Sequence, residues 1–260
     1  MLSEVNEGIF VRQSEFCLTN SVVVRVDDGL ILIDPGVTGR DLSGLADDLD
    51  ALGGGVVAGF ATHPHWDHVL WHERFGRQVP RFATARCAAV CRERRERLRT
   101  MTAAQSPDTP LDLVGEVSAI EDEAPWNEWG LRFIAHDAHA PGHAAVMIDG
   151  GRTLIAGDML SDVEIPLLDP GADDSWGDYL SGFALLETEI GPELGALIPG
   201  HGQVAFGLSI RSRVAADRTY LDALAQGRDP EDPRVGPKAI YGTDWLPEAH
   251  VRNISLVPHS

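Results

Sequence analysis

The sequence predicts an α/β protein with a four-layer αββα sandwich built from two pseudo-duplicated halves. Three observations favour this fold class. The order hairpin, aspartate, helix, strand and histidine occurs twice, ending first at His63 and then at His201. Both halves alternate short apolar runs with segments of helical spacing. The 260 residues are 43% hydrophobic, which suffices for one large core, so we expect a single domain over residues 1–260.

The first half begins with a predicted hairpin. Residues 21–26 are rich in β-branched side chains, residues 27–29 are a turn signal, and the apolar residues 30–33 lead to Asp34. From Thr38 apolar residues recur at helical spacing until three glycines at 53–55 end the pattern. The buried strand expected over residues 56–61 then runs into His63.

The second half repeats these elements. Predicted strands 145–148 and 153–156 flank the turn 149–151 and lead to Asp158, and a helix over residues 174–190 precedes strand 196–198, which runs into His201. Between the halves we expect a helix over 83–100, a turn-rich break at 106–110 and a strand over 131–135. Two β-layers packed face to face, with helices outside, would bring the polar strand ends together along one edge.

The C-terminal region starts with a helix after Ile210 that closes at Gly227. The proline-rich tail over residues 228–260 is expected to pack on the domain. Its role stays open between wrapping the surface, completing the substrate pocket and forming an oligomer contact such as a homodimer interface.

Composition excludes several classes of partner. The formal net charge of -19 repels phosphate backbones and anionic membranes, so we expect neither nucleic acid nor membrane as a partner. The first residues lack a secretion signal and the three cysteines have no paired CxxC spacing, which predicts a cytoplasmic protein with reduced thiols. Arginines between positions 92 and 99 are interrupted by glutamates and fit a solvated helix.

The run from His63 to His68 (HPHWDH) carries the strongest chemical signal. Crowded imidazoles and carboxylates lose solvation unless a cation gathers them, so the run predicts a metal site. His63 and His65 point the same way in an extended segment, whereas Asp67 and His68 follow at the turn into a helix and can face a second position. One loop can therefore serve two metals.

These residues match the HxHxDH signature and resemble the metallo-β-lactamase fold superfamily. Asp34 resembles its first, mainly structural aspartate, and residues 141–143 (PGH), 157–158 (GD) and 199–202 (PGHG) resemble its later motifs. The resemblance implies the αββα fold already expected from the repeat. It also implies that Asp34 fixes the loop by hydrogen bonds rather than binding metal.

The resemblance implies a ligand for every position of a dinuclear centre. The first metal would take His63, His65 and His143, the second would take Asp67, His68 and His201, and Asp158 would bridge them. His139 is expected to support the ligands rather than to bind. A complete set with a bridging carboxylate resembles the glyoxalase II and lactonase branch, because zinc β-lactamases usually lack that carboxylate.

Nitrogen and oxygen ligands suit two Zn²⁺ ions, with iron or manganese as further candidates. A hydroxide bridging the two metals is the predicted nucleophile, oriented by Asp67 as the catalytic residue, for attack on a small-molecule ester, thioester or lactone. The apolar residues 165–168 are expected to border the substrate. Two alternatives stay open: a mononuclear iron enzyme resembling persulfide dioxygenases, and a non-catalytic binding protein that retains the fold.

Overall fold

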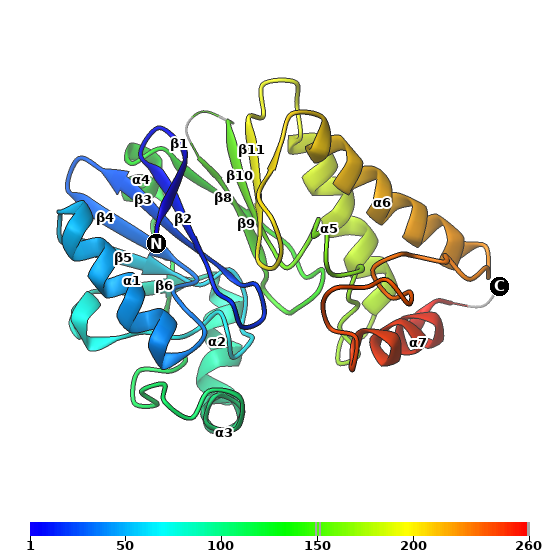
Figure 1. Ribbon diagram of the computed structural model, residues 1–260, viewed down its shortest axis with the longest axis horizontal. Helices are drawn as coiled ribbons and strands as arrows, with labels where there is room; N and C mark the ends of the chain where they lie inside the picture. Colours follow the sequence, from blue (N-terminus) through cyan, green and yellow to red (C-terminus); the bar gives the residue numbers. More distant parts are fainter. Residues whose placement is uncertain (149, 151, 259–260) are drawn as a thin grey trace.

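The computed structural model describes residues 1–148, 150 and 152–258. Its strands form two mixed sheets that face each other (Figure 1). Across the described residues the first sheet has seven strands in sequence order: β1 (Ser3–Asn6), β2 (Ile9–Gln13), β3 (Asn20–Val26), β4 (Gly29–Ile33), β5 (Val56–Phe60), β6 (Arg81–Ala83) and β7 (Ser118–Ala119). The second sheet has the order β12 (Ala205–Phe206), β11 (Ala196–Pro199), β10 (Thr153–Gly157), β9 (Ala144–Ile148) and β8 (Leu131–Ala135).

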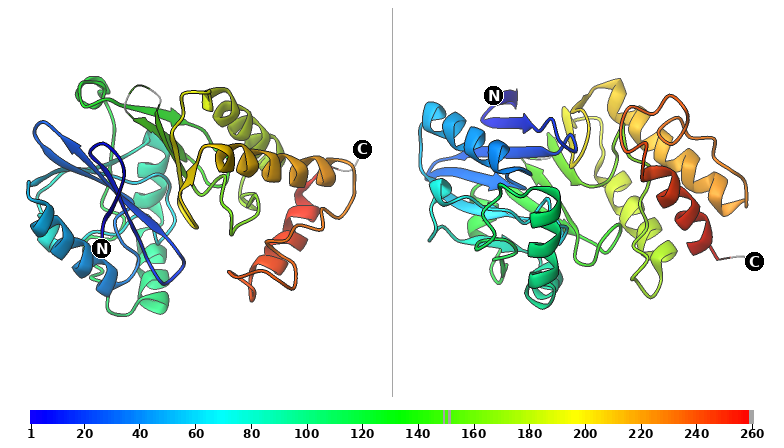
Figure 2. Two further views of the ribbon diagram at one scale, coloured as in Figure 1. Left: turned by 45° about the horizontal axis from the view of Figure 1, so that its top comes forward. Right: turned by 60° about the horizontal axis from the view of Figure 1, so that its bottom comes forward.

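Helices cover the outer face of each sheet. The first sheet is covered by α1 (Gly39–Leu52), α2 (Ala85–Glu93) and α3 (Arg95–Gln105), and α4 (Ala124–Glu128) leads into β8. The second sheet is covered by α5 (Ser175–Glu189) and α6 (Leu208–Ala225), and α7 (Leu246–Leu256) packs on the outside against α6 (Figure 2). The predicted four-layer αββα sandwich is therefore confirmed. Among the described residues no helix is long and apolar enough to cross a membrane.

Strand alternation explains how one sheet supports two cores. On β3 the side chains of Val22 and Val24 enter the core between the sheets, whereas Val23 enters the core beneath α1. Successive side chains of a strand point to opposite faces, so a strand buried on both sides must be apolar at every position. Such a run carries no amphipathic signal, and its β-branched residues identify it as a strand.

The two halves share their topology. In the first half β3 pairs antiparallel with β4, which pairs parallel with β5. In the second half β9 pairs antiparallel with β10, which pairs parallel with β11. In the predicted turn 149–151, residues 149 and 151 lie outside the described residues.

The helix predicted over residues 83–100 is wrong in its extent. Thr84 caps α2 through a hydrogen bond from the Cys87 backbone N–H, and α2 ends at Glu93, with Arg94 as the junction before α3 begins at Arg95. Residues 81–83 form strand β6 instead. The tail also contains a helix, α7, whose Leu246 lies in the core with α5 and α6.

Candidate metal centre

The candidate site lies where four strands end between the two sheets. Asp34 follows β4, His63 follows β5, Asp158 follows β10 and His201 follows β11. Because β4 pairs parallel with β5 and β10 pairs parallel with β11, the ends of each pair lie at the same edge. The described residues there form two adjacent groups of histidines and aspartates, all of them buried except His65.

The first group consists of His63, His65, His139 and Asp158. His63 Nε2 lies 3.0 Å and His139 Nε2 lies 3.1 Å from His65 Nδ1. Asp158 Oδ2 lies 3.4 Å from both His63 Nε2 and His139 Nε2. One ligand atom from each of the four residues therefore faces a common point.

The second group consists of Asp67, His68 and His201. His201 Nε2 lies 3.3 Å from His68 Nε2 and 3.3 Å from Asp67 Oδ2. Asp158 reaches this group as well, with Oδ1 3.2 Å from His68 Nε2 and Oδ2 3.3 Å from His201 Nε2. Asp158 thus touches both groups, as expected for a bridging carboxylate.

Asp34 and Thr62 orient two of these imidazoles. Asp34 accepts hydrogen bonds from the Thr62 backbone N–H at 2.8 Å, from Thr62 Oγ1 at 2.6 Å and from His68 Nδ1 at 2.9 Å. Because the Thr62 hydroxyl proton goes to Asp34, we assign His63 Nδ1 at 3.0 Å as the donor to Thr62 Oγ1. With Nδ1 as the donor in both rings, Nε2 is the nitrogen of each ring that faces the centre and can bind a metal ion. The hydrogen-bonding role expected for Asp34 is confirmed.

His201 and His139 are oriented by backbone carbonyls. His201 Nδ1 donates to the Cys17 carbonyl at 2.7 Å, and His139 Nδ1 donates to the Leu167 carbonyl at 3.2 Å. Cys17 has a φ of 60° and His139 a φ of 69°, a region that non-glycine residues enter rarely. The folded loops maintain these conformations so that the Nε2 atoms face the centre.

The structure brings His139 into the first group and leaves His143 beside it. His143 Nε2 accepts the backbone N–H of Asp158 at 3.2 Å, and His143 Nδ1 lies 3.2 Å from His136 Nε2. A nitrogen that accepts this backbone hydrogen bond has no lone pair free for a metal. His143 therefore lies at the candidate site in a different role from the one that the sequence motif implies.

The pKa values of the site histidines shift in opposite directions. Burial lowers the pKa of His63 well below its usual value and lowers the pKa of His65 to about 3. Burial also opposes the charged form of His68, but the carboxylates of Asp158, Asp67 and Asp34 outweigh it and raise its pKa. The ring nitrogens and carboxylate oxygens that converge at about 3.0–3.5 Å form a donor set that suits zinc, iron or manganese.

Sequence reasoning missed Glu164 as a member of the site. Its carboxylate lies in a third buried group with Asp158 and His201, and burial raises its pKa. Glu164 follows Asp158 by six positions in a loop, and no regular spacing marked it. The neighbouring apolar run offered the only signal, since that run was expected to border the substrate.

A cavity of about 570 Å³ opens onto the candidate metal centre. Leu167 and Leu168 line it as expected, whereas Ile165 is buried in the hydrophobic core and is not among the described lining residues. The C-terminal tail contributes Tyr241 and Trp245, so the tail completes this cavity. Its remaining lining includes Cys17, Trp66, Met101, Glu164, Asp244 and Arg252.

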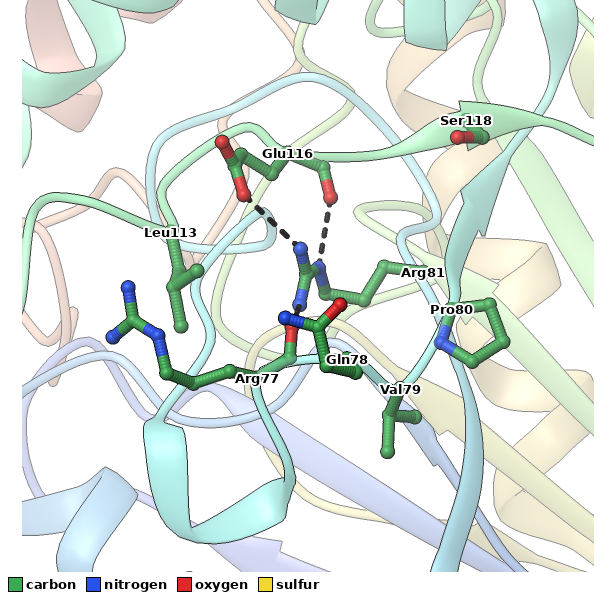
Figure 3. Close-up of a pocket in the computed structure, with 8 residues that line it drawn as sticks. All are labelled: Arg77, Gln78, Val79, Pro80, Arg81, Leu113, Glu116 and Ser118. Atoms are coloured by element: carbon green, nitrogen blue, oxygen red, sulfur yellow. Dashed lines mark hydrogen bonds and ion pairs between the residues drawn. The ribbon is translucent and has the colours of Figure 1, made fainter.

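A separate cavity of about 320 Å³, shown in Figure 3, has no part in this site. Its arginines already have partners: Arg81 donates to the Glu116 carboxylate at 3.2 Å and to the Glu116 carbonyl at 2.8 Å, and Arg77 pairs with Asp112. No histidine is among its described lining residues.

Comparisons with known proteins agree with the geometry. A family model described as the metallo-beta-lactamase superfamily matches residues 14–201. A beta-lactamase domain protein from Burkholderia ambifaria superposes with a TM-score of 0.64 at 19% identity, over 86% of this chain and 77% of that one. The DIM-1 metallo-beta-lactamase superposes with a TM-score of 0.59 at 15% identity, over 84% of this chain and 97% of that one. TTHA1623 in a di-iron-bound form superposes with a TM-score of 0.59 at 25% identity, over 79% of this chain and 98% of that one.

A search of curated proteins found no match. The family model nevertheless covers well over half of the chain and ends at His201, a member of the second ligand group. The chain therefore belongs to the metallo-beta-lactamase superfamily.

Proposed function

We propose that this protein is a metal-dependent hydrolase that binds two divalent ions and cleaves an ester, thioester or lactone bond of a small molecule. The observation that carries the proposal is the pair of adjacent ligand groups that Asp158 joins. A mononuclear site needs only the first group, so the second group favours two ions.

The proposed ligand set differs at one position from the set implied by the sequence motif. The first ion takes His63, His65 and His139, because His143 Nε2 already accepts a backbone hydrogen bond. The second ion takes Asp67, His68 and His201, and Asp158 bridges the two ions.

Zinc is the preferred ion on donor chemistry, and the di-iron form of TTHA1623 supports iron as well. When bound, two such ions supply a hydroxide between them and polarise the substrate carbonyl. Asp67 and Asp158 place two carboxylates beside that position. Asp67 Oδ2, 3.5 Å from His68 Nε2, can orient the nucleophile and receive its proton.

The cavity supports a small, partly apolar substrate. Trp66, Leu167 and Trp245 provide apolar walls beside the centre, and about 570 Å³ admits a small molecule. A carbonyl compound with an apolar acyl group fits these walls better than a phosphodiester polyanion, since the net charge of -19 repels phosphates.

The test combines metal analysis with a substrate screen. Purified protein should contain two ions per chain and should hydrolyse at least one of a panel of lactones, esters and thioesters, with β-lactams and phosphodiesters as comparison substrates. One iron per chain with oxygen uptake would instead identify the persulfide dioxygenase type. Full metal loading without turnover of any substrate would identify a binding protein.

A further inference from the structure

Glu164 is a buried carboxylate that the ligand set above does not use. It lies in the loop between β10 and α5 and is only 4% exposed. Its Oε2 has no hydrogen-bond partner among the described residues. A charged carboxylate with a buried, unpartnered oxygen costs several kcal/mol, so Glu164 needs a cation beside it to stay charged.

The side chain lies next to the second ligand group. One oxygen of Glu164, one oxygen of Asp158 and one ring nitrogen of His201 all lie within 4.8 Å of one another. Glu164 also lines the cavity that opens onto the centre. The unpaired oxygen and this third group are separate observations, and both indicate a cation at the same place.

The backbone of Glu164 is held firmly. Ser161 Oγ accepts the Glu164 backbone N–H at 3.1 Å, and Arg234 donates to the Glu164 carbonyl at 2.9 Å. The Arg234 guanidinium forms its ion pairs with Asp217 and Asp232. Arg234 therefore holds the Glu164 backbone, whereas its own charge is paired with Asp217 and Asp232.

We propose that Glu164 is a further ligand of the second metal ion, which rests on the dinuclear site proposed above. The two metal positions then differ in chemistry. The first is rich in nitrogen, with three histidines, whereas Glu164 gives the second a third carboxylate beside Asp67 and Asp158. Oxygen ligands suit harder ions, so the second position should accept manganese or iron(II) more readily than a site without Glu164.

The experiment measures metal binding, not turnover. Wild type, Glu164→Gln and the matched control Asp244→Asn are stripped with a chelator and titrated with Zn²⁺ and with Mn²⁺, and bound ions per chain are counted by mass spectrometry. Asp244 lines the same cavity but is exposed and belongs to none of the ligand groups found among the described residues. Asp244→Asn therefore removes the same charge from the same cavity without removing a ligand.

Glu164→Gln should keep the first ion and bind the second about 100-fold or more weakly, with a larger loss for Mn²⁺ than for Zn²⁺. The Co²⁺-substituted variant should also show an altered visible absorption spectrum, because the coordination of one ion changes. Asp244→Asn should bind both ions like wild type.

The proposal is overturned if Glu164→Gln binds both ions as wild type does, or if both variants weaken binding equally, since the effect is then long-range charge. Should Glu164→Gln fail to fold by circular dichroism, Glu164→Asp replaces it, and unchanged second-ion affinity in that shortened variant overturns the proposal. Wild type that binds only one ion would instead refute the dinuclear function itself.

Discussion

His139 and His143 lie four residues apart in one loop, yet their ring nitrogens have different partners. His139 Nε2 faces His65 and Asp158, whereas His143 Nε2 accepts the Asp158 backbone N–H. His139→Asn should therefore lose the first ion, whereas His143→Asn should keep both ions and weaken binding by about 10- to 100-fold at most.

Titration of both variants with Zn²⁺, followed by counting of bound ions, checks this difference. The reverse result, with the ion lost only from His143→Asn, would restore the ligand set implied by the sequence motif. Spacing could not distinguish the two histidines, because the loop between them has an irregular backbone with positive φ values at His139 and Gly142. Such loop conformations do not follow from hydrophobic periodicity.

Asp34 supports the ligand His68 through a hydrogen bond and is not itself a proposed metal ligand, so its substitution tests this support alone. Its φ of 49° is one that asparagine tolerates well, so Asp34→Asn preserves the backbone and removes only the charge. Without the carboxylate, His68 loses a charge-assisted hydrogen bond that fixes its tautomer. Metal affinity should fall about 10- to 100-fold in a competition titration, and an unchanged affinity would show that Thr62 and packing suffice.

At the scale of elements, the hairpins and the helices α1, α5 and α6 were predictable because their hydrophobic patterns are local. The break between α2 and α3 was not, since no glycine or proline marks Arg94. Arg95 and Arg99 donate to backbone carbonyls of residues 111–115, so tertiary contacts hold α3 in its own direction. Helix α7 was not predicted, because the prolines around it indicated a tail without regular structure.

Arg234 joins α6 to the loop that carries Glu164, because it pairs with Asp217 of α6 and donates to the Glu164 carbonyl. Arg234→Met should destabilise the protein by about 3–5 kcal/mol, because it leaves the buried Asp217 and Asp232 without their cation. Adding Asp217→Asn should recover part of that loss, since one uncompensated charge disappears and the amide oxygen still accepts hydrogen bonds. Urea unfolding of the metal-free proteins measures both effects, and additive losses would argue against the pairing.

Across the whole molecule, the repeat of hairpin, helix and parallel strand explains why distant ligands meet. Each half places an aspartate and a histidine at the ends of parallel strands, and the core of β3, β4, β9 and β10 side chains between the sheets holds the two edges together. The fold class was predictable because the order of hairpin, helix and strand occurs twice in the sequence. The contribution of the tail to the cavity was not, since Tyr241 and Trp245 carry no periodic signal.

Because each sheet supplies part of the ligand set, bound ions should act as links between the halves. Ions held at 100 times their dissociation constant stabilise the folded state by about 2.7 kcal/mol per site. For a protein of this size, chelation should then lower the Tm by about 5–10 °C per site. Differential scanning fluorimetry with and without chelator measures the shift, and Zn²⁺ added back should restore it. A Tm that chelation leaves unchanged would mean that the histidines and aspartates hold the strand ends together without metal.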